Sequence, residues 1–319
     1  GTVGDQTQAD ILNPDHPLAA GLSGTVDLYK SPKTLSTFTS ASPDAIKVAS
    51  ALGQPGTGAL VAFLPGAKME SDFVAPGRRV CLGLHSAVPE AYTSQARALF
   101  RAAVVWSLSP QKNILFVHAP SGGVPSATDQ ALVDELTRGL GQSVKLRPVS
   151  SAAEKPAGSE ADAVDLVIVS ESVGSGNVTD AFKDVTKPVL LLEAFIADDM
   201  LVAVPGTVGD QTQADILNPD HPLAAGLSGT VDLSTFTSAS PDAIKVASAL
   251  GQPETGALVA FLPGAKMESD FVAPGRRVCL GLHSAVPEAY TSQAKALFRA
   301  AVTWSLSPVS YTHLRAHET

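Results

Sequence analysis

The sequence predicts an α/β fold: an open parallel sheet with helices on both faces, together with a duplicated C-terminal half-domain. Two observations lead to this prediction. Between residues 111 and 205, continuously apolar runs alternate with helical patterns, an order typical of parallel sheets. Residues 1–110 recur almost letter for letter as residues 206–308. A repeat of this length decides the domain organisation and has to be recognised before any fold is assigned.

The two copies differ very little. The second copy lacks YKSPKTL, residues 29–35, and carries three substitutions, which pair Gly56 with Glu254, Arg97 with Lys295 and Val105 with Thr303. We expect residues 1–110 to be the C-terminal half of a preceding repeat and residues 111–308 to be a complete domain. Because residues 1–110 would lack the parallel strands of such a domain, the first copy is expected to be partly unsupported.

The two ends of the chain indicate a fragment. The chain starts at Gly1 without a methionine, in what the repeat predicts to be the middle of a domain. Residues 309–319, VSYTHLRAHET, have no counterpart after Pro110 and resemble one reading frame of a sequencing-adapter DNA. We expect this tail to be an artefact without order and leave it out of the fold prediction.

Composition restricts the classes of function. The formal net charge is −9, without a cluster of basic residues, which argues against nucleic-acid binding because phosphates require a Lys/Arg surface. The longest apolar runs are too short to span a bilayer. Cys81 and Cys279 occupy the same position of the two copies, so neither a disulfide framework nor a Cys-x-x-Cys site is predicted.

The first half of the complete unit reads as four strands with intervening helices. The four candidate strands are residues 113–118, 143–149, 164–170 and 188–193. Ser126 and Asp129 form an S-x-x-D capping pattern, and the helical periodicity that follows stops at Gly141. A short helix is expected over residues 177–185. Runs that are apolar throughout are typical of strands covered on both faces.

The second half of the unit has more strand character. Its candidate strands are residues 244–250, 256–261 and 277–283. An amphipathic helix is expected from about Glu288 to the end of the repeat. Its buried stripe should consist of Ala294, Leu297, Phe298 and Ala301, which recur at helical spacing.

Polar residues follow the predicted parallel strands at one edge of the sheet. They are His118, Ser170, Glu171, Ser172, Glu193, His283 and Ser284. Ligands of open parallel sheets bind beyond the carboxyl ends of the strands. We therefore consider Glu193 or Glu171 with His283 as a general acid/base pair, and the remaining four as ligand-binding candidates. The alternative is that all seven are polar residues that end strands and have no function.

Metal binding is a second hypothesis for this edge of the sheet. His118, His283, Glu171, Glu193, Asp198 and Asp199 carry suitable ligand atoms, but no HExxH pattern or close His/Cys spacing accompanies them. An exposed turn is the simpler interpretation of Asp198 and Asp199. The sequence has neither a GxGxxG nor a Walker loop, so neither a metal nor a cofactor is predicted.

Several stretches resemble the trehalose-utilisation (ThuA-like) family. They include HPLAAGLSGTVDLY at residues 16–29, and GRRVCLGLHSA followed by a helix that ends in WSL. KNILFVHA, DLVIVSESVGSGNV and KPVLLLEAFIADDM resemble a variant group of the same glutamine amidotransferase-like superfamily, which tends to occur inside large, secreted bacterial proteins. The resemblance implies a flavodoxin-like sheet and favours an extracytoplasmic location.

One departure from that superfamily bears on activity. The nucleophilic cysteine of class I glutamine amidotransferases corresponds to Glu193 here, and a carboxylate cannot form a glutamyl thioester. We expect a module that is non-catalytic or binds a carbohydrate-related small molecule, next to neighbouring repeats of the same parent chain. The alternatives are a hydrolase or other sugar-active enzyme that uses Glu193, Glu171 and His283, and an architectural spacer.

Overall fold

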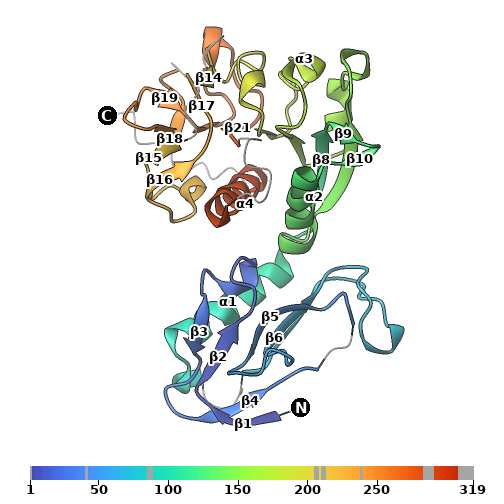
Figure 1. Ribbon diagram of the computed structural model, residues 1–319, viewed down its shortest axis with the longest axis vertical. Coiled ribbons are helices and arrows are strands. Elements are labelled where there is room, and N and C mark those ends of the chain that lie inside the picture. The colour runs from blue at the N-terminus through green and yellow to red at the C-terminus, as the bar shows by residue number, and fades with distance from the viewer. Residues whose placement is uncertain are drawn as a thin grey trace. The chain divides into compact units, whose positions relative to one another are not determined.

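The computed structural model divides the chain into two compact units (Figure 1). One consists of Gly1–Gln111 with Thr137–Gly141, and the other of Lys112–Leu136 with Gln142–Thr319. The structure describes residues 2–39, 42–84, 89–204, 208–209, 213–237, 240–282 and 291–307. His283 and Ser284, both site candidates, lie outside the described residues, as does the C-terminal tail.

A nine-stranded mixed sheet forms the second unit, in the order β11-β8-β12-β13-β21-β20-β18-β15-β16. Its parallel strands are β8 (Asn113–His118), β11 (Ser143–Pro148), β12 (Leu166–Val169), β13 (Val189–Leu191) and β21 (Arg277–Leu280). The antiparallel strands are β15 (Gln213–Ile216), β16 (Gly229–Asp232), β18 (Ile244–Ala249) and β20 (Leu258–Phe261). The α/β class is confirmed, but the sheet is not parallel throughout.

Two kinds of connection explain the mixed sheet. Residues 112–204, here called the parallel half, carry long crossovers between their strands, as parallel pairing requires. Residues 208–307, here called the C-terminal half, reverse direction from strand to strand and so pair antiparallel. The halves meet where β21 lies parallel to β13. Short strands complete the unit: β9 (Pro120–Ser121) with β10 (Val124–Pro125), and β14 (Val208–Gly209) with β17 (Thr235–Thr237) and β19 (Thr255–Gly256).

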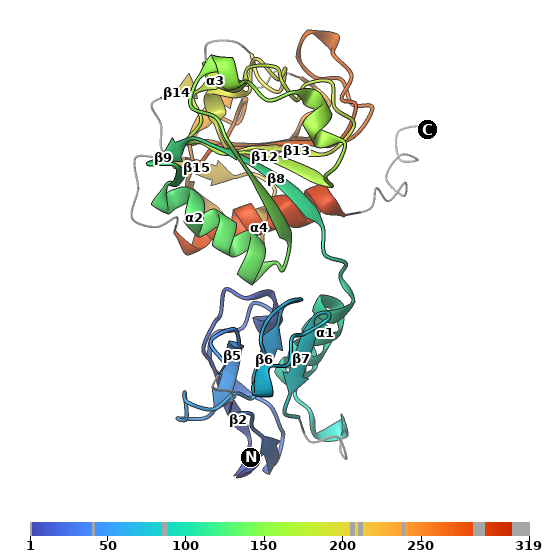
Figure 2. The same ribbon diagram turned by 90° about the vertical axis from the view of Figure 1, so that its right-hand side faces the viewer.

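Helices α2 (Ala127–Asp134) and α4 (Ser292–Leu306) lie on one face of this sheet, and α3 (Ser175–Val178) lies on the other (Figure 2). The Ser126 hydroxyl accepts a hydrogen bond from the Asp129 amide, so the predicted helix cap is present. The short helix predicted over residues 177–185 is present only as α3, which ends at Val178. Thr179 has a φ of 45°, which ends α3, and turns follow up to residue 184. None of the described helices is long and apolar enough to cross a membrane.

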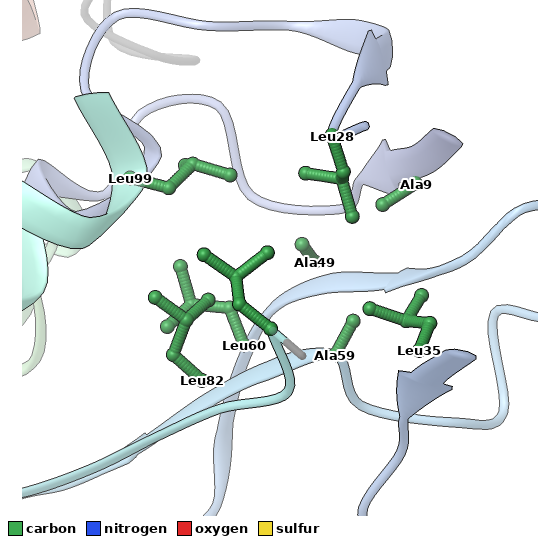
Figure 3. A pocket seen from close by; sticks show the side chains of 9 residues that line it. Ala9, Leu28, Leu35, Ala49, Ala59, Leu60, Leu82 and Leu99 are labelled. Atoms are coloured by element: carbon green, nitrogen blue, oxygen red, sulfur yellow. The ribbon is translucent and has the colours of Figure 1, made fainter. Parts of the chain in front are cut away.

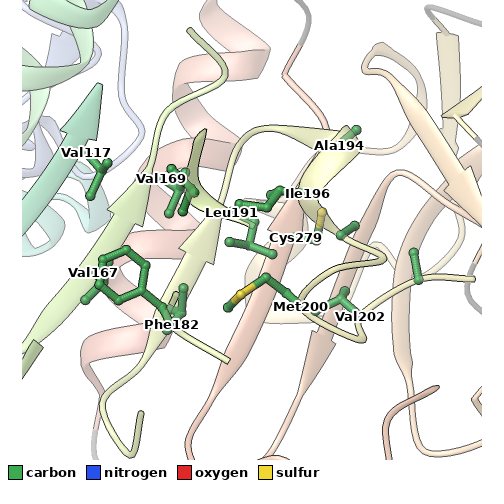
Figure 4. Packing of buried hydrophobic residues seen from close by; sticks show 14 of the residues in the cluster. Val117, Val167, Val169, Phe182, Leu191, Ala194, Ile196, Met200, Val202 and Cys279 are labelled. Atoms are coloured by element: carbon green, nitrogen blue, oxygen red, sulfur yellow. The ribbon is translucent and has the colours of Figure 1, made fainter. Parts of the chain in front are cut away.

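The face that carries α3 packs into one apolar core (Figure 4). Every other residue of β8, β12 and β13 contributes to it, as the two-residue period of a strand requires. Segments between and after these strands, together with the buried Cys279 of β21, contribute the other members of the cluster. Its members include Val117, Val167, Val169, Phe182, Leu191, Ile196, Met200, Val202 and Cys279.

The first unit contains a smaller, antiparallel sheet in the order β3-β2-β5-β6-β7. Its strands are β2 (Gln8–Ile11), β3 (Gly24–Asp27), β5 (Ile46–Ala51), β6 (Leu60–Phe63) and β7 (Arg79–Leu82), and α1 (Ser94–Leu108) packs against it. The first copy therefore has a core of its own. Figure 3 shows a cavity in that core, lined by nine alanine and leucine side chains. A cavity without polar groups is a packing gap and offers no group for chemistry.

The seven residues missing from the second copy change one strand pairing. In the first unit, β1 (Thr2–Gln6) pairs with β4 (Lys33–Ser36), and Val3 lies opposite Leu35. Because the second copy lacks the counterpart of Leu35, its Val208 pairs with Phe236 instead. Within the residues that the structure describes, this pairing covers Val208 and Gly209 of β14. The deletion is thus accommodated by the next segment of the chain.

The matched cysteines provide a test of this fold. Cys279 is fully buried between β13 and β20, whereas Cys81 at the sheet edge is half-buried. Since thiols react as accessible thiolates, Cys81 should react with iodoacetamide in the native protein at least tenfold faster than Cys279. The tryptic peptides end at Arg97 and at Lys295, so mass spectrometry separates them. Equal labelling rates would contradict the assigned environments.

Candidate functional site

Two of the predicted ligand-binding residues lie side by side at the carboxyl edge of the parallel strands. Val117 and Val169 are in register on β8 and β12, which places His118 next to Ser170 and on the same face of the sheet. The rings of Phe116 and His118 stack at 6.3 Å on that face. His118 and Ser170 are both buried.

A buried carboxylate of α2 receives the Ser170 side chain. Asp129 is 1% exposed and accepts hydrogen bonds from the hydroxyls of Ser170 and Ser126, the latter at 2.9 Å. These contacts fasten the first turn of α2 to the end of β12. The sequence marked Asp129 as part of a helix cap, and its contact with Ser170 was not predicted. Two hydroxyl donors offset part of the cost of burying this carboxylate.

The same network continues across the end of β8. The Ser172 amide donates to the Ser170 hydroxyl at 3.2 Å, and the Ala119 amide donates to the Ser172 hydroxyl at 3.0 Å. His118 Nδ1 lies 3.2 Å from the Ala119 carbonyl oxygen. Since β8 and β12 flank the point where the strand order reverses, this is the place where open sheets bind ligands. In this structure, the polar groups at that place form hydrogen bonds with one another.

Glu193 occupies the opposite face of the sheet. It follows Leu191 by two residues with an extended backbone (φ −87°, ψ 110°), and Leu191 belongs to the core on the α3 side. Strand alternation therefore separates Glu193 from His118 and Ser170. One carboxylate oxygen accepts the Phe195 amide at 2.8 Å. This bond caps the short 3₁₀ helix Ala194–Ile196.

Burial gives Glu193 an unusual proton affinity. The side chain is 8% exposed, and burial raises the pKa of its carboxyl to about 7, with a smaller contribution from the Glu171 charge. The hydrogen bond from Phe195 opposes the rise. Burial also raises the pKa of the Cys279 thiol, and the Glu193 charge adds to that effect. Cys279 is therefore held as a thiol.

The single convergent site expected from the sequence thus divides into two. The hydroxyl network of Ser170 and Ser172 lies toward α2, and Glu193 lies toward the other core, within electrostatic reach of Glu171. The sequence correctly placed these residues at one edge, but it ignored the faces to which they point. His283 and Ser284 are not among the described residues, so the pairing of Glu193 with His283 stays a prediction.

Asp198 and Asp199, which follow β13, were among the six residues considered as metal ligands, with an exposed turn as the simpler interpretation. Burial raises the pKa of Asp199, with contributions from the charges of Asp198 and Asp180. Within the part of the chain that the structure describes, no three His, Cys, Asp or Glu side chains are grouped so that they could hold a metal ion.

Comparison of the chain with models of known protein families finds no match. Comparison with curated proteins finds none either. Among solved structures, the crystal structure of a "Putative thua-like protein" from Bacteroides uniformis is similar over 63% of this chain and 93% of its own, at 13% sequence identity and a TM-score of 0.38. A TM-score this low does not establish a shared fold, so the ThuA-like family stays a prediction.

Stability should depend on pH through Glu193. Because the folded-state pKa of about 7 exceeds the ordinary 4.5, the unfolded chain releases this proton first as the pH rises. The free energy of unfolding should therefore fall between pH 4.5 and 7, by on the order of 3 kcal/mol from this group. Glu193→Gln should remove the fall, whereas the exposed Glu254→Gln should not. Trp304 fluorescence in a Trp106→Phe background reports unfolding of the second unit, and a retained fall in Glu193→Gln would refute the assignment.

The Asp129 network should also contribute to stability. Ser170→Ala removes one of the two hydroxyl donors and leaves a buried carboxylate oxygen without that bond, which should lower the free energy of unfolding by roughly 1–3 kcal/mol. The exposed Ser121→Ala should change it by less than about 0.5 kcal/mol. Urea titration followed through Trp304 measures both, and equal effects would show that the network is not stabilising.

Proposed function

We propose that residues 112–307 form a non-catalytic, ThuA-like module that binds an uncharged, hydroxyl-rich small molecule such as a carbohydrate, within a multidomain extracytoplasmic protein. The motifs given above support the family. The order of the parallel strands, β11-β8-β12-β13-β21, supports a flavodoxin-like sheet, since it is the 2-1-3-4-5 order of that fold. The location rests on the resemblance alone.

One observation carries the proposed ligand class: the pKa of about 7 at Glu193. A carboxyl with this raised pKa is partly protonated at neutral pH, and a protonated carboxyl both donates and accepts hydrogen bonds. A sugar hydroxyl also donates and accepts, so a protonated Glu193 could bond to it in either direction without leaving an unpaired charge in the buried site. The neighbouring Phe195 is 63% exposed, and an exposed ring beside a polar group suits the apolar face of a sugar.

The residues at and beside the position of the amidotransferase nucleophile argue against glutamine amidotransferase chemistry. Glu193 offers no thiolate for a glutamyl thioester. Its extended backbone is an ordinary conformation, unlike the sharp, strained turn that exposes the nucleophile of α/β-hydrolases. Cys279, on the neighbouring strand, is buried with a raised pKa, and a buried thiol with a raised pKa is unreactive.

An enzyme that acts on a sugar is the second candidate, and the same pKa favours it. A carboxyl that titrates near 7 is suited to proton transfer at neutral pH. Glu171 and His283 would be its partners. Binding and catalysis are separable in Glu193→Gln, because an amide retains hydrogen bonding but cannot transfer a proton. Product formation by the native protein that Glu193→Gln abolishes would favour the enzyme.

Binding of neutral sugars tests the proposal. Saturation-transfer NMR with neutral mono- and disaccharides should detect binding that weakens as the pH rises from 6 to 8, because Glu193 loses its proton in that range. Glu193→Gln should bind without this pH dependence. Phe195→Ala should weaken binding about tenfold, while Phe73→Ala, an equally exposed ring in the first unit, should not. Absence of binding to every sugar would refute the proposal and favour the architectural spacer.

A further inference from the structure

One surface of the first unit is exposed, whereas the same residues of the second copy are covered by the parallel half in the second unit. This surface, here called the docking face, consists of the outer edge of β7, Arg79, Phe73, and Phe100 with Val104 of α1. We propose that the docking face binds a second parallel half, a polypeptide segment with the chemistry of residues 112–204. The second unit shows how such a half covers the same sequence.

The helix carries the apolar part of the docking face. Phe100 is 53% exposed and Val104 is 41% exposed on α1. Their counterparts on α4, Phe298 and Val302, are 0% exposed. Because α4 packs on β13 as well as on β21, the burial comes from the parallel half. The same helix without that half leaves two large apolar side chains in water.

The strand edge supplies the directional part. Among the described residues, β7 pairs with β6 alone and forms the edge of its sheet. Its counterpart β21 pairs with β20 on one side and with β13 on the other, where Val189 lies opposite Arg277. An open edge binds an added strand through its main-chain groups. The expected occupant is therefore a parallel, apolar strand that lies opposite Arg79.

The arginine at the start of the strand specifies the turn before the added strand. Arg277 is fully buried, and its guanidinium donates to the carbonyl oxygens of Lys183, Val185 and Lys187 at 2.9, 2.5 and 3.1 Å. Arg79 has the same sequence environment but is exposed. A rigid fork of donors that meets several carbonyls discriminates between partners. The occupant thus needs a turn of outward carbonyl oxygens ahead of its apolar strand.

A glycine provides room for that turn. A β-carbon on Gly275 would lie 2.3 Å from the Thr186 carbonyl oxygen, so the parallel half requires glycine there. A β-carbon on Gly77, the counterpart in the first unit, would meet no atom closer than 3.7 Å. Gly77 therefore has free space at the position where Gly275 meets the backbone of the parallel half. The three substitutions between the copies, at positions 56, 97 and 105, all lie outside the docking face.

The loop before β7 points to the same occupant. Phe73 is 56% exposed, whereas its counterpart Phe271 is half-buried and packs against the core that the parallel half builds. Lys183 of that half lies 5.7 Å above the Phe271 ring. In the second unit, the counterparts of the β7 edge, Arg79, Gly77 and Phe73 all contact residues 182–191. A single class of occupant accounts for all of them.

The test supplies a second parallel half and measures the accessibility of Cys81. The full chain is extended by a further copy of residues 111–205 placed directly before Gly1, and iodoacetamide labelling is followed by mass spectrometry. The added strand should cover β7, so that Cys81 labelling slows at least tenfold toward the rate of Cys279. Unchanged labelling of Cys81 in the extended chain overturns the proposal.

Matched variants assign the effect to the docking face. Arg79→Glu and Val104→Asp change exposed residues, so the fold of the first unit should persist, and each should restore Cys81 labelling in the extended chain. Val105→Asp, at a neighbouring position that is 65% exposed and differs between the copies, should leave Cys81 protected. Sedimentation of the unextended chain tests a different occupant: a dimer that Phe100→Asp dissociates would identify a second copy of the chain and overturn the proposal.

Discussion

The parallel pairing of β13 with β21 is the interaction on which the second unit depends. It joins four parallel strands to a C-terminal half whose remaining strands are antiparallel, and so makes one sheet from two. The consequences reach beyond the strands. The pairing buries Arg277 against the carbonyl oxygens of the turn before β13 and encloses Cys279. It also closes the core beneath Glu193, whose pKa rises mainly because that carboxyl is desolvated.

Much of the fold is encoded locally and could be predicted for that reason. The strands β8, β12 and β13 are apolar on both faces, and the S-x-x-D pattern at Ser126 specifies the start of α2. The helix expected over residues 177–185 ends early, at Val178, because the sequence does not reveal that Thr179 adopts a positive φ. The mixed character of the sheet depends on how the strands of the C-terminal half reverse, which follows from pairing across the fold.

The site was predictable only in part. The ends of the parallel strands were correctly identified as one edge, but the two-residue period could have separated the face of His118 and Ser170 from that of Glu193. The contact between Ser170 and Asp129 joins residues 41 positions apart, and nothing near either residue announces it. Burial of Glu193 likewise depends on segments that pack against it from elsewhere in the chain. Such properties belong to the assembled core.

The duplicated sequence separates local from tertiary effects within one chain. Arg-Val-Cys-Leu forms a strand in both units, so the secondary structure is local. The same four residues are fully buried in β21, whereas in β7 the arginine is exposed and the others are half-buried. The missing contribution is the parallel half, which also supplies Glu193. The pairing of β13 with β21 and the proposed ligand site at Glu193 therefore form together. A ligand that binds Glu193 would stabilise this pairing by mass action.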